Sequence, residues 1–238
     1  MKKLLKRWLA APPRLPPAQA TRLAAWQDIS PAVLSTPCVQ ARYVVVDVET
    51  TGLNLMTDTL ISIGAVAVVG GRISLADSFS VVLQQDRVSR RENILIHGIT
   101  GTVQREGMPP ADALLDFLDY LGKSPLVAFH AALDEAMIQR AMRQYLGLSF
   151  KHPWLDLAYL MPALYPALAR RHRVLDDWTG RFNIRNAARH DALADAMVTA
   201  QLLQVALAQA RFKQATDFSA LRDLEKSAAL GAPHVSCL

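Results

Sequence analysis

The sequence predicts an α/β protein built around one mixed sheet. Strand-like segments come first, over 43–49, 60–69 and 73–83, and segments with helical spacing alternate with a further strand after them. The chain has 238 residues, 51% of them hydrophobic, which is enough for one sizeable core. Hairpin-connected strands followed by alternating strands and helices favour a mixed sheet in a single domain at about 41–212.

Residues 1–40 are predicted to be a basic, proline-containing extension. One helix candidate lies in the basic segment before Pro12, where four of the first seven residues are Lys or Arg, and another lies around 21–30. Four prolines between the two preclude one continuous helix. The apolar stretch between Arg7 and Pro12 is far shorter than the apolar region of a signal peptide, so we do not expect export.

Cysteine usage and hydropathy predict a cytoplasmic protein without a membrane-spanning helix. Cys38 and Cys237 lie in the terminal segments without metal-ligand spacing, as expected of a reducing compartment. The longest apolar run, 60–69, is interrupted by Gly64 and is too short to span a bilayer. The net charge of +5 is compatible with a polyanionic partner, although such an excess is also common as solubilising charge.

Turn residues divide the chain into elements. Gly70-Gly71 between two strand-like runs predicts a tight hairpin, so the first three strands are expected to form an antiparallel meander. The segment 96–110 is rich in turn residues, and a stripe of leucines after it predicts a helix that Gly122 ends. A buried strand at 125–130 and a helix at 133–147 follow. The remaining predicted elements are helices at 156–165, 172–182 and 191–213 and a tail at 213–238.

Two acids follow the first buried strand at positions i and i+2. Asp47 and Glu49 in "DVETTGL" project from the same face of the strand, where their charges repel. A divalent cation between them relieves the repulsion, and hard oxygen ligands favour Mg²⁺ or Mn²⁺ over zinc. The alternative is a strand end that emerges into solvent, and for an isolated Asp-x-Glu that alternative is the commoner one.

Later acids and a histidine decide between these interpretations. Asp134 follows the strand "PLVAFH" at the opening of a helix, and "RHDALADAM" supplies His190 and, five residues on, Asp195. Taken singly, each of these is an ordinary surface or helix-end residue. In this order, on these elements, they resemble the DEDDh exonucleases, also called the DnaQ-like family, over about residues 42–210. "IHGIT" is similar to a loop of the proofreading-type members, among them the polymerase III epsilon subunits.

The resemblance implies a ribonuclease H-like fold with a mixed five-stranded sheet and a site that binds two Mg²⁺ or Mn²⁺ ions. It implies that Asp47 bridges the ions, that Glu49 and Asp195 complete one site and that Asp134 supports the other. His190 takes the role of general base, since its unperturbed pKa lies near physiological pH. The family positions that contact the 3′-terminal nucleotide correspond to Thr50, Thr51, Leu53 and His130.

The second motif departs from the family pattern. Members commonly carry Asn after the motif histidine and Phe before the motif aspartate, whereas this chain has Ala131 and Leu133 at those positions. Asp156 in "WLDLAYL" is therefore a competitor for Asp134, and we interpret it as a helix N-terminal or structural carboxylate. The sister branch of the family has Tyr four residues before the last aspartate, where this chain has Asp191, so the histidine branch matches better.

The function that the resemblance implies is hydrolysis of DNA from single-stranded or frayed 3′ ends to nucleoside 5′-monophosphates. The alternatives are a 3′→5′ exoribonuclease with the same catalytic residue types and a binding module without turnover. A polymerase or repair partner also stays open. Arginines ahead of the third motif suit either a solvated helix face or a surface that steers phosphates toward the site; they are Arg170, Arg171, Arg173, Arg181, Arg185 and Arg189.

Overall fold

The computed structural model describes residues 13–186 and 188–231. The helix candidate before Pro12 and the position of Cys237 lie outside the described residues.

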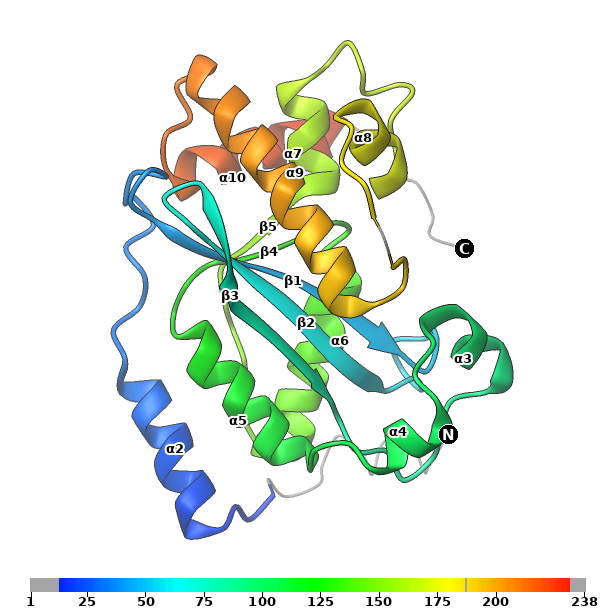
Figure 1. Ribbon diagram of the computed structural model, residues 1–238. Coiled ribbons are helices and arrows are strands. Elements are labelled where there is room, and N and C mark those ends of the chain that lie inside the picture. The colour runs from blue at the N-terminus through cyan, green and yellow to red at the C-terminus, as the bar shows by residue number, and fades with distance from the viewer. Residues whose placement is uncertain (1–12, 187, 232–238) are drawn as a thin grey trace.

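Five strands form one mixed sheet in the order β3-β2-β1-β4-β5 (Figure 1). β1 (Arg42–Thr50), β2 (Leu60–Val69) and β3 (Arg72–Val82) form the predicted antiparallel meander, and Gly70 and Gly71 turn the hairpin with φ of 57° and 77°. β4 (Leu126–Ala128) and β5 (Trp154–Asp156) extend the sheet in parallel on the other side of β1. The predicted mixed five-stranded sheet is confirmed, and β1 is its central strand.

Helices cover both faces of this sheet. One apolar cluster joins the sheet to α2 (Pro17–Asp28), α5 (Pro110–Leu121) and α6 (Ala132–Ala141). A second cluster, on the opposite face, joins it to α7 (Leu157–Leu164), α8 (Leu175–Arg181), α9 (Ala192–Phe212) and α10 (Phe218–Gly231). The core therefore has two layers separated by the sheet.

The side chains of β1 alternate between the two layers. Val44, Val46 and Val48 belong to the cluster of α5 and α6, whereas Tyr43 and Val45 belong to the cluster of α9. Because successive side chains of a strand point to opposite faces, the next members of the second series are Asp47 and Glu49. The two acids therefore extend the α9 face of the central strand.

The structure corrects the sequence prediction in several segments. The turn-rich segment contains α4 (Gly101–Arg105), and α3 (Arg91–His97) lies just before it. Residues 154–156 form an edge strand, so the helix predicted from 156 begins one residue later. The predicted helix at 133–147 is α6 followed by a π-helical turn, η1 (Met142–Leu146), and ends at Gly147 as expected. Most of the predicted tail is helical in α10.

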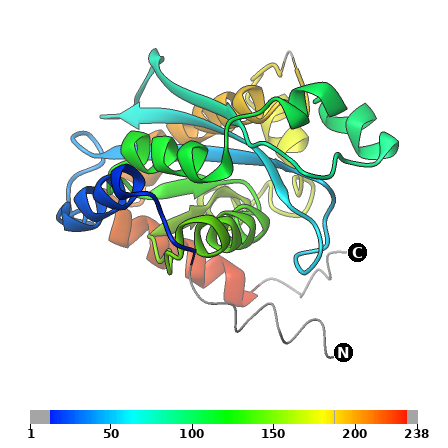
Figure 2. The same ribbon diagram turned by 90° about the horizontal axis from the view of Figure 1, so that it is seen from below.

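The segments at the two ends pack on the body of the fold. Arg22 of α2 forms an ion pair with Asp116 of α5 at 2.7 Å, and the indole nitrogen of Trp26 donates to the Gly122 carbonyl oxygen at 2.7 Å. Figure 2 shows α2 beside α5 from below. At the other end, α10 packs against α7, and an isolated β-bridge between Pro37 and Asp217 joins the two end segments to each other. The proposed division of the chain at residues 40 and 212 stays a prediction.

Among the described helices, α9 is long and apolar enough to cross a membrane by length and composition alone. It packs against β1 and β2, and 56% of its most apolar window is buried inside the protein. This is the placement of a core helix.

Candidate active site

A glycine in β2 brings the first turn of α9 onto the sheet beside the acids of β1. In the β1–β2 ladder, Asp47 lies opposite Gly64. A Cβ atom added at Gly64 would lie 2.2 Å from the carbonyl carbon of Ala192 and 2.2 Å from the amide nitrogen of Leu193. No side chain fits between these backbones, so α9 begins in direct contact with the strand next to Asp47.

This contact places the third-motif residues at the acids. Asp191 caps α9 by accepting a hydrogen bond from the Ala194 amide at 2.9 Å, and His190 precedes the helix with a φ of 64°. Asp195 is only 3% exposed and accepts from the His190 amide at 2.9 Å. One ligand atom from each of Glu49, His190 and Asp195 lies within 4.8 Å of the others, which is a separation that one metal ion spans.

Asp195 has two further partners that the motif did not predict. The Arg189 guanidinium lies 2.9 Å from its Oδ1 and also pairs with Asp176 of α8 at 3.3 Å. The side-chain amide of Asn186 donates to the same oxygen. The segment before His190 is therefore held to the buried carboxylate.

Asp134 enters the site from the opposite layer. It is the third residue of α6, which begins after β4, and it is 6% exposed. Because β1 and β4 are parallel neighbours, the start of α6 comes to the carboxyl end of β1. Glu49 and Asp134 are close enough for their charges to interact.

Asp156 lies at a helix N-terminus, which agrees with its interpretation as a helix N-terminal or structural carboxylate. Its side chain caps α7 by accepting from the Ala158 amide at 2.9 Å. It also accepts from the amides of His130 at 2.9 Å and Ala131 at 3.0 Å. Asp156 thus fixes the loop that leads into α6, where Asp134 is located.

Burial and mutual repulsion raise the pKa values of Asp47, Glu49 and Asp134. Burial raises the pKa of Asp47 well above its usual range, and the charges of Asp134, Asp195 and Glu49 raise it further. Burial and the charges of Asp195 and Asp191 raise the pKa of Glu49 to about 8, while Arg189 opposes the shift. Burial also raises the pKa of Asp134, with repulsion from Asp156 and Glu49 adding to it. Arg189 lowers the pKa values of Asp47 and Glu49, but the net shift of both is upward.

The donor set fits a hard divalent cation. Carboxylate oxygens dominate it and one imidazole is within reach, a donor set that divalent cations bind. A cation at this position would stabilise the ionised form of the acids whose pKa values are raised.

A second set of polar residues orders the loop after β1. Asn93 of α3 donates to the Thr51 carbonyl oxygen, and the Thr51 hydroxyl donates to Asp58 at 3.0 Å. Thr59 donates to the buried Gln85 at 3.1 Å. Sequence analysis missed Asn93 and Gln85 because hydrogen bonds to distant loop atoms produce no periodic signal.

The predicted nucleotide-contacting residues differ in exposure. Thr50 is buried, and its hydroxyl donates to the Gly52 carbonyl oxygen at 2.7 Å, whereas Leu53 is 76% exposed just beyond the turn. His130 is exposed with a φ of 63°, and its ring lies edge-on to Phe129. Leu53 and His130 are therefore accessible enough to contact a nucleotide. The contact roles of all four residues stay predictions.

A sequence model of an exonuclease family matches residues 44–203. The Bacillus subtilis DNA polymerase III PolC-type is 35% identical over 162 residues, which cover 68% of this chain and 11% of the relative. The DNA polymerase III subunit epsilon of Aquifex aeolicus is 28% identical over 186 residues, covering 77% of this chain and 90% of the relative. The chain thus spans about a tenth of the PolC-type relatives and most of the epsilon subunit.

Solved structures share the fold. Escherichia coli exonuclease I in complex with a dT13 oligonucleotide superposes with a TM-score of 0.62 at 17% identity, over 74% of this chain and 43% of the other. Exonuclease X in complex with 5′-overhanging duplex DNA gives a TM-score of 0.58 at 21% identity, over 77% of this chain and 99% of the other. The family model matches residues 44–203, and the motif acids of this chain lie together at one end of β1. This chain therefore belongs to the DnaQ-like exonuclease family.

Proposed function

We propose that this chain is a metal-dependent 3′→5′ exonuclease that acts on DNA and releases nucleoside 5′-monophosphates. The observation that carries the proposal is the meeting of Glu49, His190 and Asp195 within 4.8 Å, beside Asp47 and Asp134. DNA is the favoured substrate because the relatives include polymerase III subunits and two structural neighbours, exonuclease I and exonuclease X, were solved with a DNA oligonucleotide and with duplex DNA.

We assign the four acids to metal binding: Asp47, Glu49, Asp134 and Asp195. Bound Mg²⁺ or Mn²⁺, two ions by the family pattern, would supply Lewis-acid activation of water and stabilise charge on the departing 3′ oxygen. The chain itself supplies a rigid strand for Asp47 and Glu49 and a helix start for Asp195. This support limits the movement of the carboxylates, which favours a fixed geometry for an in-line displacement.

His190 is proposed to accept the proton of the attacking water. Its side chain is exposed, while its backbone amide is anchored to Asp195 at 2.9 Å. The imidazole therefore has freedom to meet a substrate, although its Cα is fixed beside the acids. Thr50, Thr51, Leu53 and His130 are proposed to seat the terminal nucleotide.

The Asp47→Asn variant tests the metal-dependent reaction. We expect hydrolysis of 3′-labelled single-stranded DNA by the wild type in Mg²⁺ or Mn²⁺, loss of hydrolysis with chelator, and almost none in the variant. Asp86→Asn, which removes an equal charge from an exposed loop residue, is the control and should remain active. Turnover by Asp47→Asn at the wild-type rate would refute the metal assignment.

Substrate form tests direction and class in the same assay. Label should appear as mononucleotide, and a 3′-phosphate should slow its release because Thr50, Thr51, Leu53 and His130 are proposed to seat a terminal nucleotide with a free 3′ end. Oligonucleotides released from circular single strands would instead identify an endonuclease. Faster hydrolysis of a matched RNA than of DNA would assign the chain to the exoribonucleases, and binding without hydrolysis of either would indicate a binding module. A polymerase partner, suggested by the epsilon relative, is tested by co-purification with the cognate polymerase.

A further inference from the structure

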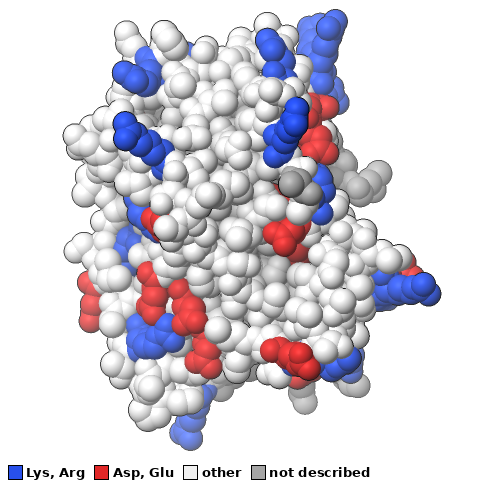
Figure 3. Space-filling view, viewed as in Figure 1, with Lys and Arg blue, Asp and Glu red and all other residues white. Residues whose placement is uncertain are grey.

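Positive charge is concentrated in the segment that leads into His190. Six arginines and two aspartates lie between residues 166 and 189, with no lysine or glutamate. This excess of four positive charges compares with a net charge of +5 for the whole chain. Figure 3 shows several Lys or Arg side chains at the upper right of the molecule, where α8 lies, among others that are spread over this face.

The two aspartates of the segment have other partners. Asp177 accepts from the backbone amides of Arg173 at 2.8 Å and Val174 at 3.2 Å, which lowers its pKa and stabilises the start of α8. Asp176 pairs with Arg189. The other five arginines of the segment 166–189 are all exposed. None of them has a carboxylate partner within 4.0 Å among residues 13–186 and 188–231. We call these five the arginine surface: Arg170, Arg171, Arg173, Arg181 and Arg185.

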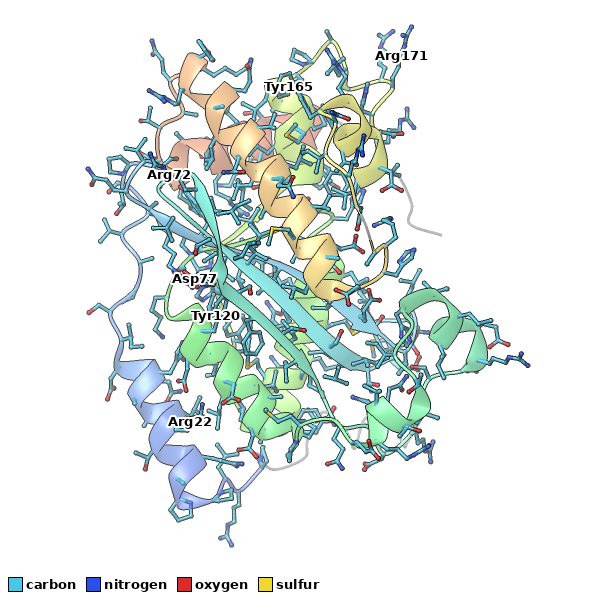
Figure 4. All side chains as sticks on the ribbon, viewed as in Figure 1. Arg22, Arg72, Asp77, Tyr120, Tyr165 and Arg171 are labelled. Atoms are coloured by element: carbon cyan, nitrogen blue, oxygen red, sulfur yellow. The ribbon has the colours of Figure 1, made fainter. Side chains whose placement is uncertain are left out.

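An aromatic cluster holds the backbone beneath the arginine surface. Trp178 of α8 is fully buried and stacks with Phe182 at 6.4 Å between ring centroids. Tyr165 lies 5.2 Å from Phe182, and His172 lies 5.1 Å from Trp178. The cluster ties the loop after α7 to α8, and Figure 4 shows Arg171 extending outward beyond this support. The arginines are thus presented from an ordered scaffold, which reduces the entropy cost of binding.

α8, which carries Arg181 of the arginine surface, is joined to the proposed active site through Arg189. This residue bridges Asp176 of α8 and the buried Asp195, and His190 follows it directly. A strand whose 3′ end lies at the acids therefore has a positively charged surface adjacent to the same site. Positive charge beside a site raises the local concentration of a polyanionic strand.

We propose that the arginine surface binds the phosphodiester backbone upstream of the terminal nucleotide. The inference rests on the proposed function. Guanidinium groups form charge-assisted hydrogen bonds with phosphate oxygens, and each neutralised phosphate of a single strand contributes about 0.7 to the salt slope of binding. Three arginines that contact three phosphates would account for a slope of about 2.

A length series tests the proposal. Binding of thymidine oligonucleotides from 2 to 20 nucleotides is measured by fluorescence anisotropy in Ca²⁺, from about 50 to about 200 mM salt, the range over which phosphate contacts lose affinity strongly. Arg170→Gln/Arg171→Gln/Arg173→Gln should reduce the slope for the 20-mer by about 2 and leave dinucleotide binding unchanged. The matched control is Arg72→Gln/Arg211→Gln/Lys213→Gln, which removes the same charge from exposed residues outside the segment. Arg72 and Arg171 lie on opposite sides of Figure 4.

Hydrolysis separates this inference from the proposed function. If the three-arginine variant cleaves a dinucleotide in Mg²⁺ at the wild-type rate and loses affinity only for long strands, both proposals hold. An unchanged slope for the 20-mer, or a change equal to that of the control, would overturn the arginine surface whatever the hydrolysis. If the wild type bound long strands in a salt-dependent way but did not cleave them, and the three-arginine variant bound them more weakly, the proposal for the arginine surface would hold and the proposed exonuclease activity would be rejected.

Discussion

Replacing Gly64 by alanine should separate the first turn of α9 from the acids of β1. The added Cβ would lie 2.2 Å from two backbone atoms of the helix and 2.4 Å from the Ala192 oxygen, whereas ordinary contact begins at 3.4 Å. The two backbones must therefore move apart by about 1 Å. β2 is hydrogen-bonded on both sides, so we expect the start of α9 to move.

The structure allows the size of the effect to be worked out. Overpacking of this kind costs about 1–3 kcal/mol of unfolding free energy, which corresponds to about 2–12 °C in melting temperature for a domain of this size. Asp195 lies in the displaced turn and His190 directly before it. A shift of about 1 Å in catalytic geometry costs about 10²-fold in rate, so the loss of activity should exceed what the loss of folded protein explains.

Thermal melts and hydrolysis assays at a temperature well below melting check this prediction. Gly180→Ala is the matched control because its Cβ would have no heavy atom within 4 Å in α8. It should leave activity unchanged and stabilise the helix by up to about 1 kcal/mol. If Gly64→Ala kept both the melting temperature and the activity of the wild type, α9 would not be seated on β2 as described. Lost stability with wild-type activity would contradict the coupling of that turn to catalysis.

Further predictions concern the site residues. His190→Ala should lower kcat by about 10²–10⁴-fold while Mn²⁺ affinity, measured by electron paramagnetic resonance, stays near wild type; His172→Ala should be active, and loss of Mn²⁺ binding in His190→Ala would make His190 a ligand instead. The pKa of Glu49 is raised from 4.5 to about 8, so the folded state binds more protons than the unfolded state between these values, and the metal-free protein should lose stability as pH rises through that window. Mg²⁺ should therefore raise the melting temperature more at pH 8.5 than at pH 5.5 in scanning calorimetry, and an equal increase would reject binding to these acids. Asp134→Asn should weaken Mn²⁺ binding without lowering the melting temperature of the metal-free protein. Asp156→Ala should lower that melting temperature, because three backbone amides lose their acceptor. The reverse pattern would exchange the roles of Asp134 and Asp156.

The strands and the hairpin were predictable because their signals are local. β2 has the predicted bounds, 60–69, since its continuous apolar run is buried on both faces of the sheet. The two glycines of the hairpin turn both have positive φ, which is the requirement that made the pair recognisable.

Other elements could not be predicted because tertiary contacts determine them. β5 has three residues and continues directly into α7, so its apolar side chains fit the helical pattern equally well. α3 and α4 have seven and five residues, too few for a periodic stripe. Their order depends on residues such as the fully buried Gln104, whose amide donates to the Ile99 carbonyl oxygen and accepts from Ser89.

The acids of the site were predictable, whereas their partners were not. Asp47 and Glu49 are marked by their spacing after a buried strand, and the third motif marks Asp195. Arg189 gives no such signal, because an arginine in a basic segment is indistinguishable from its neighbours until the fold places it against a buried carboxylate. The sequence does not indicate the role of Gly64 either, because this glycine interrupts an apolar run without forming a turn.

The position of the site follows from the position of β1 in the sheet. β1 is the central strand, with an antiparallel neighbour on one side and a parallel neighbour on the other. The parallel neighbour delivers α6 and Asp134 to the carboxyl end of β1, and the glycine in the antiparallel neighbour admits α9 and Asp195 to the same end. Repulsion among the acids then disfavours their ionised form, and the surrounding core offsets that cost. A bound divalent cation would remove the repulsion among the acids, and the same repulsion destabilises the metal-free fold at high pH. Metal affinity and the loss of stability at high pH should therefore change together in any variant of the acids.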